Sequence, residues 1–445
     1  MQESLEHVLA RVRAAGAEGD AVALEGVSTT VRVRLGEVDL VSQSRDRGIG
    51  VRVFHGERSA VASTSDLQFS ALDELVDATM GRAQSTAAVE HAGLPDVALM
   101  GGGPEGLALE GAGENLSVED AIQMARAAEE SALAVDPRLT QSSGAEVSWG
   151  QSTRTFGTST GFQAAYTGSM HSLRVTPVAD VGGELTRDSW ASVRRHAGDL
   201  ATPEEVGRIA GERTASRIGA TTAETCRVPV VFDPRAAGRL AVALANALNG
   251  YSVQRGQSFL KDRIGERIAV PGFHLFDDPL LERGLGSRPF DGEGLPSRRN
   301  ALIEDGVIQN YLLDTFMGRK LGLPSTHAAR RGIAGAPTAG TTNLCIAPGS
   351  ASPDEIIGSV QDGLYVTEMF GFGVNPTTGD ISQGAAGLWI REGRISHPVQ
   401  EITIAGHLLS LFESLEAIGN DPHPESTIRT PTLKFGEMTV GGGQG

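Results

Sequence analysis

The chain has 445 residues and a formal net charge of −17, with 57 glycines and 40% apolar residues. The acidic balance argues against a nucleic-acid partner, because binding to a phosphate backbone needs clustered Lys and Arg. No apolar run reaches the roughly 18 residues of a membrane-spanning helix. We therefore expect a globular protein of about two domains with no nucleic-acid or membrane partner.

The cysteines and the N-terminus both favour a cytoplasmic location. Cys226 and Cys345 are far apart and fit no CxxC pattern, so neither a disulfide framework nor a zinc ribbon is indicated. The first residues, MQESLEHVLARVR, have the pattern of a charged amphipathic helix rather than of a signal peptide.

In the first half of the chain, helical and strand-like patterns are interspersed. Glycine-centred turns at 35–37 and 55–57 join alternating segments, which predicts antiparallel strands. Residues 93–115 are a Gly/Pro-rich connection, and residues 139–189 return to a strand-like pattern with glycine turns. Apolar residues at helical spacing predict three helices, at 4–17, 71–86 and 119–135.

The second half is expected to be rich in short strands. It is preceded by a helix that Thr202 caps and Pro203 opens. A strand at 228–232 leads into a helix that Asp233 caps and that is expected to run to Gly250. Further turns are expected at 304–306 and 391–393, and a further helix from Ser352 to near Gly363.

Together these patterns predict an α+β fold of two domains. Residues 1–225 are expected to form an N-terminal domain that combines helices with an antiparallel sheet. Residues 226–445 are expected to form a strand-rich domain with an antiparallel sheet and few helices.

Two glycine-rich segments formally match functional motifs. Residues 157–161 (GTSTG) match the nucleophile elbow G-x-S-x-G, but that elbow needs a strand and then a helix, and strands flank it here. Residues 101–106 (GGGPEG) match the phosphate-binding pattern G-x-G-x-x-G, without the strand before it or the helix after it. We interpret the first segment as a hairpin turn and the second as a linker.

Histidines and carboxylates offer weak candidates for a site of the chain's own. His397 and His407 are the pair of histidines best placed to converge on a metal, although surface or capping roles are preferred for them. Asp277, Asp278 and Glu282 form a carboxylate cluster that could serve acid–base catalysis. Adjacent aspartates before a proline more often cap a turn.

Several long strings resemble the TldD/TldE family, in which TldE is also called PmbA, and the resemblance covers nearly the whole chain. It rests on DRGIGVRVFHGERSAVASTSDL, SFLKDRIGERIA, RPFDGEGLPSRRNALIEDGVIQNYLLDTFMGRKLG, TGDISQGAAGLWIREGRISHPVQEITIAG and the GND at 419–421. The resemblance implies a soluble prokaryotic protein linked to a zinc peptidase and to the processing of peptide antibiotics.

In the TldD branch of this family, a helix carries HExxxH: two histidines bind zinc, the glutamate activates the metal-bound water, and a later cysteine completes the coordination. The matching positions here are Ala241, Val242 and Asn246, and no cysteine follows Cys345. The resemblance therefore implies no catalytic residue, no metal ligand and no cofactor in this chain. It does not identify the substrate-binding residues.

By these positions the chain resembles the TldE branch, although its PTLKFGEMTVGG ending is close to that of TldD. The resemblance implies a non-metal subunit that forms a heterodimer with a TldD-type subunit, which would hold the zinc; a homodimer is possible when the chain is alone. Its implied role is to help form the cavity that binds an unfolded or small peptide, without being catalytic by itself.

Two alternatives stay open. The first is a regulatory binding protein, because the resembled family has been associated with modulation of DNA gyrase, and the acidic charge is compatible with a basic protein partner. The second is a self-sufficient homodimeric hydrolase built around His397, His407 or Asp277.

Overall fold

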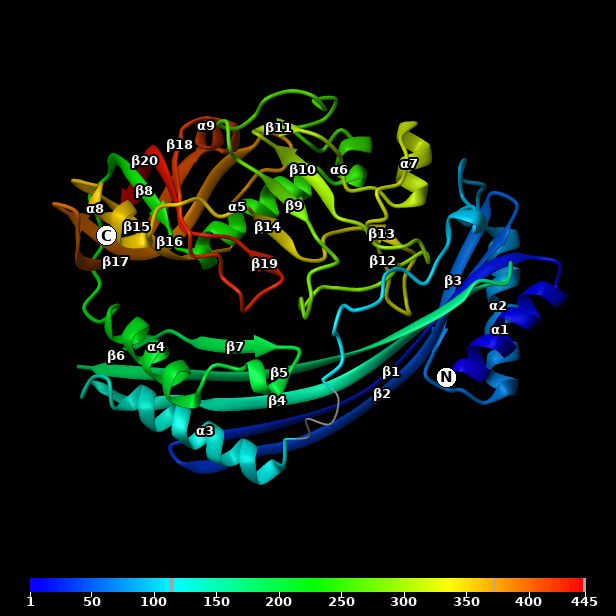
Figure 1. The fold of residues 1–445 in the computed structure, drawn as a ribbon, viewed down its shortest axis with the longest axis horizontal. Coiled ribbons are helices and arrows are strands. Elements are labelled where there is room, and N and C mark those ends of the chain that lie inside the picture. Colours follow the sequence, from blue (N-terminus) through cyan, green and yellow to red (C-terminus); the bar gives the residue numbers. More distant parts are fainter. Residues whose placement is uncertain (112–115, 372, 443–445) are drawn as a thin grey trace.

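The computed structural model describes residues 1–111, 116–371 and 373–442 (Figure 1). Within these residues, the N-terminal half is built on one seven-stranded antiparallel sheet in the order β3-β2-β1-β4-β5-β6, with β7 paired to β5. Its long strands bend together into a curved layer (Figure 1). The strands are β1 (Glu18–Arg34), β2 (Glu37–His55), β3 (Arg58–Thr64), β4 (Leu139–Thr158), β5 (Gln163–Val181), β6 (Glu184–Arg187) and β7 (Trp190–Arg194).

Alternation along the strands gives this sheet two different faces. On β1, Ala21, Ala23 and Val31 pack into the cores beneath the helices, whereas Val22 packs with Phe290 of the C-terminal half. The C-terminal half lies over the concave side of the sheet (Figure 1). The helices of the N-terminal half are α1 (Gln2–Ala14), α2 (Phe69–Ser85), α3 (Val118–Leu133) and α4 (Pro203–Ala215), with 3-10 turns η1 (Val97–Leu99) and η2 (Ala197–Asp199).

The C-terminal half contains a second sheet, in the order β17-β16-β15-β8-β20-β18. Strand β20 also pairs with β17, where Val440 lies opposite Ile404, so the sheet closes on itself. Neighbouring strands in it are antiparallel except for β8 and β15. The strands are β8 (Cys226–Phe232), β15 (Asp362–Phe370), β16 (Asp380–Arg391), β17 (Arg394–His407), β18 (Leu415–Ile418) and β20 (Leu433–Gly442).

A smaller sheet and several helices complete this half. The sheet has the order β11-β10-β9-β14-β19, and β12 pairs with β13 in a separate ribbon. These strands are β9 (Leu275–Asp277), β10 (Asn300–Glu304), β11 (Val307–Ile308), β12 (Ala329–Arg330), β13 (Thr338–Ala339), β14 (Leu344–Ile346) and β19 (Ile428–Arg429). The helices are α5 (Pro234–Ala247), α6 (Gly250–Gln254), α7 (Thr315–Leu321), α8 (Pro353–Gly358) and α9 (Leu408–Glu413).

The predicted α+β fold with antiparallel sheets is confirmed, and so is much of the local chemistry. Thr202 caps α4 by accepting a hydrogen bond from the Glu205 backbone N–H at 3.2 Å. The helix that begins after Ser352 has its capping box but ends at Gly358, earlier than predicted. The division into residues 1–225 and 226–445 stays a prediction. None of the helices among the described residues is both long and apolar enough to cross a membrane.

The central helix α5 also ends earlier than predicted. It stops at Ala247, and the side chain of Asn249 accepts a hydrogen bond from the Tyr251 backbone N–H at 3.0 Å, which caps a separate short helix, α6. Gly250 is therefore not the C-terminal residue of α5. A Cβ at Gly250 would lie 2.5 Å from Leu313 Cδ2, so this glycine permits a close approach between two segments.

Close backbone packing joins the two halves where β2 meets a loop of the C-terminal half. A Cβ on Gly50 would lie 1.9 Å from the carbonyl oxygen of Ile333, and one on Gly48 would lie 2.7 Å from Ile333 Cδ1. A side chain at either position would push the loop away from the sheet. This is the physical reason for two glycines in the DRGIGV string.

A buried ion network, the Asp20 network, holds the same region together. Asp20 on β1 accepts hydrogen bonds from Arg52 on β2 and from Arg331 of the C-terminal half. Glu293 lies on the other side of Arg52, with 3.7 Å between its Oε1 and Arg52 Nη2. Burial alone would raise the pKa of Asp20, but the two guanidinium groups outweigh it and hold that pKa below its usual value.

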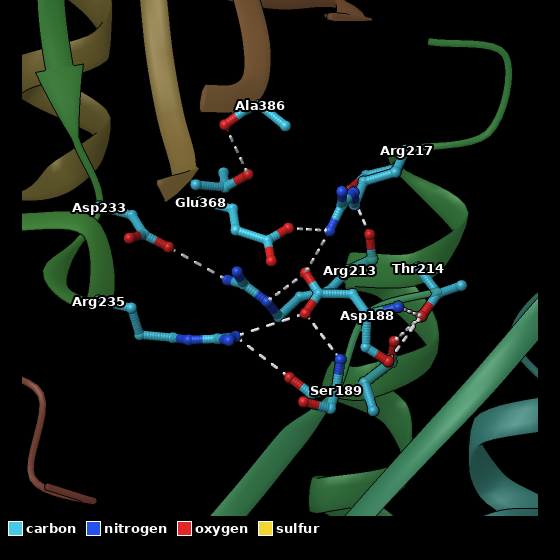
Figure 2. A network of polar contacts seen from close by, with 12 residues as sticks. Asp188, Ser189, Arg213, Thr214, Arg217, Asp233, Arg235, Glu368 and Ala386 are labelled. Atoms are coloured by element: carbon cyan, nitrogen blue, oxygen red, sulfur yellow. Dashed lines mark hydrogen bonds and ion pairs between the residues drawn. The ribbon is translucent and has the colours of Figure 1, made fainter. Parts of the chain in front are cut away.

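A second network joins the halves through α4 (Figure 2). Arg213 bridges two carboxylates: its Nε lies 3.2 Å from Asp188 Oδ2, and its Nη1 lies 3.3 Å from Asp233 Oδ2. Asp233 is also the N-cap of α5. Arg217, one turn further along, pairs with Glu368 on β15 at 2.5 Å. The start of α5 is thus fixed by residues of the N-terminal half.

We predict that Asp20→Asn lowers the free energy of unfolding by about 3–5 kcal/mol, because it leaves two buried guanidinium groups without their shared anion. Urea unfolding followed by circular dichroism measures this change. The matched control is Glu25→Gln, whose partner Arg45 is exposed, and which should cost less than about 1 kcal/mol. A similar small loss for both variants would contradict this role of Asp20.

Candidate functional site

A cleft of about 1250 Å³ lies between the concave face of the large sheet and the C-terminal half. One wall consists of residues of β1, β2, β4 and β5, and most of the other comes from residues 285–292 and 330–342. Small residues such as Gly26, Gly150 and Gly168 keep the sheet side of the cleft open. A cavity of this size can hold a peptide segment of several residues, since sites for small molecules are usually about 300–1,000 Å³.

One carboxyl group in the lining of this cleft, that of Asp291, has a raised pKa. Burial and the neighbouring Glu293 raise the pKa of Asp291 to about 7. Asp291 Oδ1 accepts hydrogen bonds from the backbone N–H groups of Glu293 and Leu295, at 2.9 and 3.0 Å, and Oδ2 accepts one from Ala329. A carboxyl group engaged in this way shapes the loop of the cleft wall, and it is poorly placed to transfer protons to a ligand.

A smaller pocket of about 290 Å³ adjoins the cleft and contains the predicted degenerate site. Val242 and Asn246 of α5 line this pocket, whereas Ala241 is fully buried in the core. The pocket shares Arg330, Thr338 and Thr341 with the cleft. Two of the three helical positions that would hold zinc in a TldD-type protein therefore lie in a pocket next to the cleft, and the first lies in the core.

The side chains of this pocket do not fit a catalytic zinc ion. The methyl group of Ala241 and the isopropyl group of Val242 have no electron pair to donate, and the neutral amide of Asn246 is a poor ligand alone. In the three described segments, no group of three or more His, Cys, Asp or Glu side chains is arranged to hold a metal ion. We assign no metal-dependent step to this chain.

The two cysteines lack the character of reactive thiolates. Burial raises the pKa of the Cys345 thiol to about 12, and its Sγ donates a hydrogen bond to the carbonyl oxygen of Asn343 at 3.5 Å. Burial also raises the pKa of Cys226. A thiol with a raised pKa is a weak nucleophile and a weak metal ligand near neutral pH.

The two glycine-rich motifs have structural roles. Residues 157–161 join β4 to β5, as predicted for a hairpin turn, and Ser159 Oγ accepts a hydrogen bond from the Gly19 backbone N–H at 2.9 Å. Residues 101–106 lie outside helices and strands. A Cβ on Gly103 would lie 1.7 Å from the Pro289 carbonyl oxygen, so this linker packs closely on the C-terminal half.

His397 and His407 do not converge on a shared site. Both lie on β17, ten residues apart, so roughly 33 Å of extended strand separates them. His397 stacks on Trp389. The ring of His407 is hydrogen-bonded to the carbonyl oxygen of Thr378 at 2.8 Å. The idea that these histidines form a metal pair is therefore wrong, and the preferred surface roles account for both.

The carboxylate cluster at 277–282 is structural as well. Asp277 accepts a hydrogen bond from the Thr342 backbone N–H and a second one from the Thr342 hydroxyl group, whose Oγ1 lies 2.9 Å from Asp277 Oδ2. Asp278 accepts one from the Leu280 backbone N–H at 2.9 Å, which is the turn predicted before Pro279. Glu282 is exposed. Asp277 is nevertheless buried enough to have an unusual pKa, of about 6.

Three family models match successive parts of the chain: PmbA/TldA metallopeptidase domain 1 at residues 19–92, the central domain at 112–218 and the C-terminal domain at 225–442. The chain is 36% identical to the metalloprotease PmbA of Escherichia coli O157:H7, over 98% of this chain and 94% of that protein. It is 26% identical to a metalloprotease TldD homologue of Haemophilus influenzae, over 89% and 87%. The chain belongs to the PmbA/TldD family of metallopeptidase-like proteins, which confirms the resemblance seen in its sequence.

Solved structures share this fold over essentially the whole chain. One is a proposed modulator of DNA gyrase from Bacteroides thetaiotaomicron, with a TM-score of 0.90 and 27% identity, covering 99% of this chain and 98% of that one. Another is TldE from Thermococcus kodakarensis, with a TM-score of 0.86 and 21% identity, covering 99% and 100%. At 21% identity, the similarity between this chain and that TldE structure shows only that the two chains share a fold.

Sequence reasoning missed the residues that line the cleft. Arg154, Arg288 and Arg330 come from separate segments and only meet in the folded chain. Arg288 begins the RPFDGEG string that carries part of the family resemblance. An isolated arginine before a proline has no motif of its own, so nothing in the local pattern distinguished it.

We predict that Asp277→Asn makes the protein less sensitive to pH. Burial raises the pKa of Asp277 from 3.8 to about 6, so between these values the folded chain binds more protons than the unfolded chain. The protonated carboxyl group of Asp277 therefore stabilises the folded chain at low pH, and this contribution to stability is lost as the pH rises from 3.8 through about 6. The asparagine variant keeps the bonds to Thr342, and it should be more stable than the wild type at pH 7 by up to about 3 kcal/mol.

Urea unfolding of both proteins between pH 4 and 7 measures this difference. Asp291 and Asp314, whose pKa values are also raised, keep some pH dependence in the variant. Identical pH slopes for the two proteins would show that Asp277 does not titrate differently on folding.

Proposed function

We propose that this chain is the non-metal, TldE-like subunit of a TldD–TldE type heterodimeric zinc metallopeptidase. In this assembly it supplies a peptide-binding wall, and a TldD-type partner supplies the zinc and performs the cleavage. The substrates are unfolded or small peptides, including precursors of peptide antibiotics. The proposed location is the cytoplasm.

The observation that carries this proposal is the pocket beside α5. The family is one of metallopeptidase-like proteins. In this member, Val242 and Asn246 line a pocket that adjoins a large cleft, and neither can act as a strong zinc ligand. A chain of a metallopeptidase-like family thus has a large cleft but lacks zinc-binding side chains in the pocket beside it. Both features are explained if this subunit forms part of the peptide-binding cavity and the other subunit holds the zinc.

The walls of the cleft suit an extended peptide. Strands β12 and β13 contribute Arg330 and Thr338 to the lining, whereas the outward N–H and C=O of Ala329 are already bonded to Asp291 and Gly292. Polar groups on a cleft wall can bind the N–H and C=O groups of a peptide backbone and fix its orientation. The cleft lies between the two halves of one chain, and a folded protein is too large for a space of about 1250 Å³.

The test is to mix the purified full chain with a TldD-type subunit that carries HExxxH and to follow cleavage of an unfolded fluorogenic peptide. We expect cleavage only with both subunits, because the partner alone lacks half of the cavity. Controls are each subunit alone and the partner mixed with heat-unfolded chain. Full activity of the partner alone would exclude a role for this chain in the peptidase.

A second candidate function is a regulator that acts on another protein, which the description of the Bacteroides thetaiotaomicron structure favours. The net charge of −17 is compatible with a basic protein partner. Affinity capture of partners from the native cell, followed by mass spectrometry, separates the two ideas. A TldD-type protein as the dominant partner supports the peptidase, and gyrase subunits as the dominant partner support the regulator.

A further inference from the structure

The charge of the cleft is opposite to that of the whole protein. The chain has a net charge of −17, yet the cleft is lined by six arginines and only three acidic residues. The acidic residues are Glu25, Asp46 and Asp291, and burial raises the pKa of Asp291 to about 7, so that it is only partly ionised at neutral pH. The arginines are Arg47, Arg154, Arg195, Arg288, Arg330 and Arg331.

Most of these arginines form no ion pair with a carboxylate in the part of the chain that the structure describes. Arg331 belongs to the Asp20 network. The other five form no ion pair with a carboxylate anywhere in the described segments. Arg195 donates only to backbone carbonyl oxygens, those of Ser169, Gly284 and Leu285. These bonds use three of the five N–H groups of the guanidinium but do not neutralise its charge.

Arg288 is the most unusual member of this group. Its Nε and Nη2 are buried and have no hydrogen-bond partner among the described residues, although the side chain lines the cleft. Burial lowers its pKa, since the charged form is poorly solvated, whereas the nearby carboxyl groups of Asp291 and Asp277 act in the opposite direction, and Arg154 adds a smaller lowering effect. A buried cation with two unpaired N–H groups still costs free energy, and such exceptions call for a specific explanation.

We propose that Arg288, with Arg154 beside it, is an anchor that binds a carboxylate group of the peptide in the cleft. The proposal rests on the proposed function, in which the cleft holds a peptide. A carboxylate would supply the anion that these guanidinium groups lack, and charge-assisted hydrogen bonds to arginine are among the strongest polar contacts in proteins. Tyr166, which also lines the cleft and lies close to Arg288, adds a hydroxyl group at the same place.

The carboxylate has two sources in a peptide, the C-terminus and the side chains of Asp and Glu. Three fluorescein-labelled peptides of one sequence distinguish them. The first has a free C-terminus and no acidic residue, the second has a C-terminal amide and one internal Glu, and the third has a C-terminal amide and Gln in place of that Glu. Binding to the full chain, and to its complex with the TldD-type subunit, is followed by fluorescence anisotropy.

We expect one or both of the carboxylate peptides to bind on the order of 10- to 100-fold more tightly than the third peptide. Arg288→Met should remove this preference, and Arg154→Gln should reduce it. Rising salt concentration should weaken the preference as well. Arg394→Met is the matched control, because Arg394 is exposed in the hairpin between β16 and β17 and lies outside the cleft. It should bind all three peptides like the wild type.

Unfolding of Arg288→Met separates binding from a structural role. If Arg288 serves a ligand, removing an unpartnered buried cation leaves the unfolding midpoint unchanged or raises it. A lowered midpoint would assign Arg288 to the fold instead.

The outcomes also distinguish the two proposals. Equal binding of the three peptides to the wild type would overturn the carboxylate anchor and leave the peptide cleft intact. If none of the peptides binds to the chain or to the complex, the peptide cleft itself fails, and the anchor fails with it.

Discussion

The carboxylate of Asp20 lies between two guanidinium groups that come from opposite halves of the chain, and the architecture of the cleft depends on this contact. Arg52 stands on the neighbouring strand, whereas Arg331 lies 311 residues away in the sequence. All three side chains are buried, so the attraction acts where water screens it little. Such a triad is costly to bury and more costly to break, because removal of one member leaves the others uncompensated. It therefore fixes one relative position of the two halves rather than many.

The cleft follows from that constraint. Glycines on β2 let the loop around Ile333 rest against the sheet, and Arg213 holds the start of α5 to α4. The two halves are in contact at both places, and the cleft lies between them. Five of the six arginines that line this space form no ion pair with a carboxylate of the described residues, and this is the basis of the proposed carboxylate anchor. A smaller pocket next to the cleft is lined by Val242 and Asn246 of α5, and the described residues contain no set of metal-binding side chains there.

Features set by neighbouring residues could be predicted from the sequence, and features set by distant contacts could not. The cap at Thr202, the capping box at Ser352 and the glycine turns of the hairpins depend on a few adjacent residues, and all are present. The break between α5 and α6 includes backbone hydrogen bonds from residues 248–250 to Leu312, a distant contact that no local pattern reveals. The cleft arginines come from segments far apart in the sequence. The empty ligand positions on α5 were found only through family resemblance, because Ala and Val on a helix are otherwise ordinary core residues.

The central claim is that this chain shapes a peptide chamber and leaves the metal chemistry to another subunit. The most direct measurement is the zinc content of the purified full chain, dialysed first against zinc and then against metal-free buffer, by elemental analysis. Our account predicts far less than one zinc ion per chain and an unfolding midpoint that zinc does not change, since Ala241, Val242 and Asn246 offer no adequate ligand set. One tightly held zinc ion per chain, with a midpoint that rises when zinc is added, would contradict it.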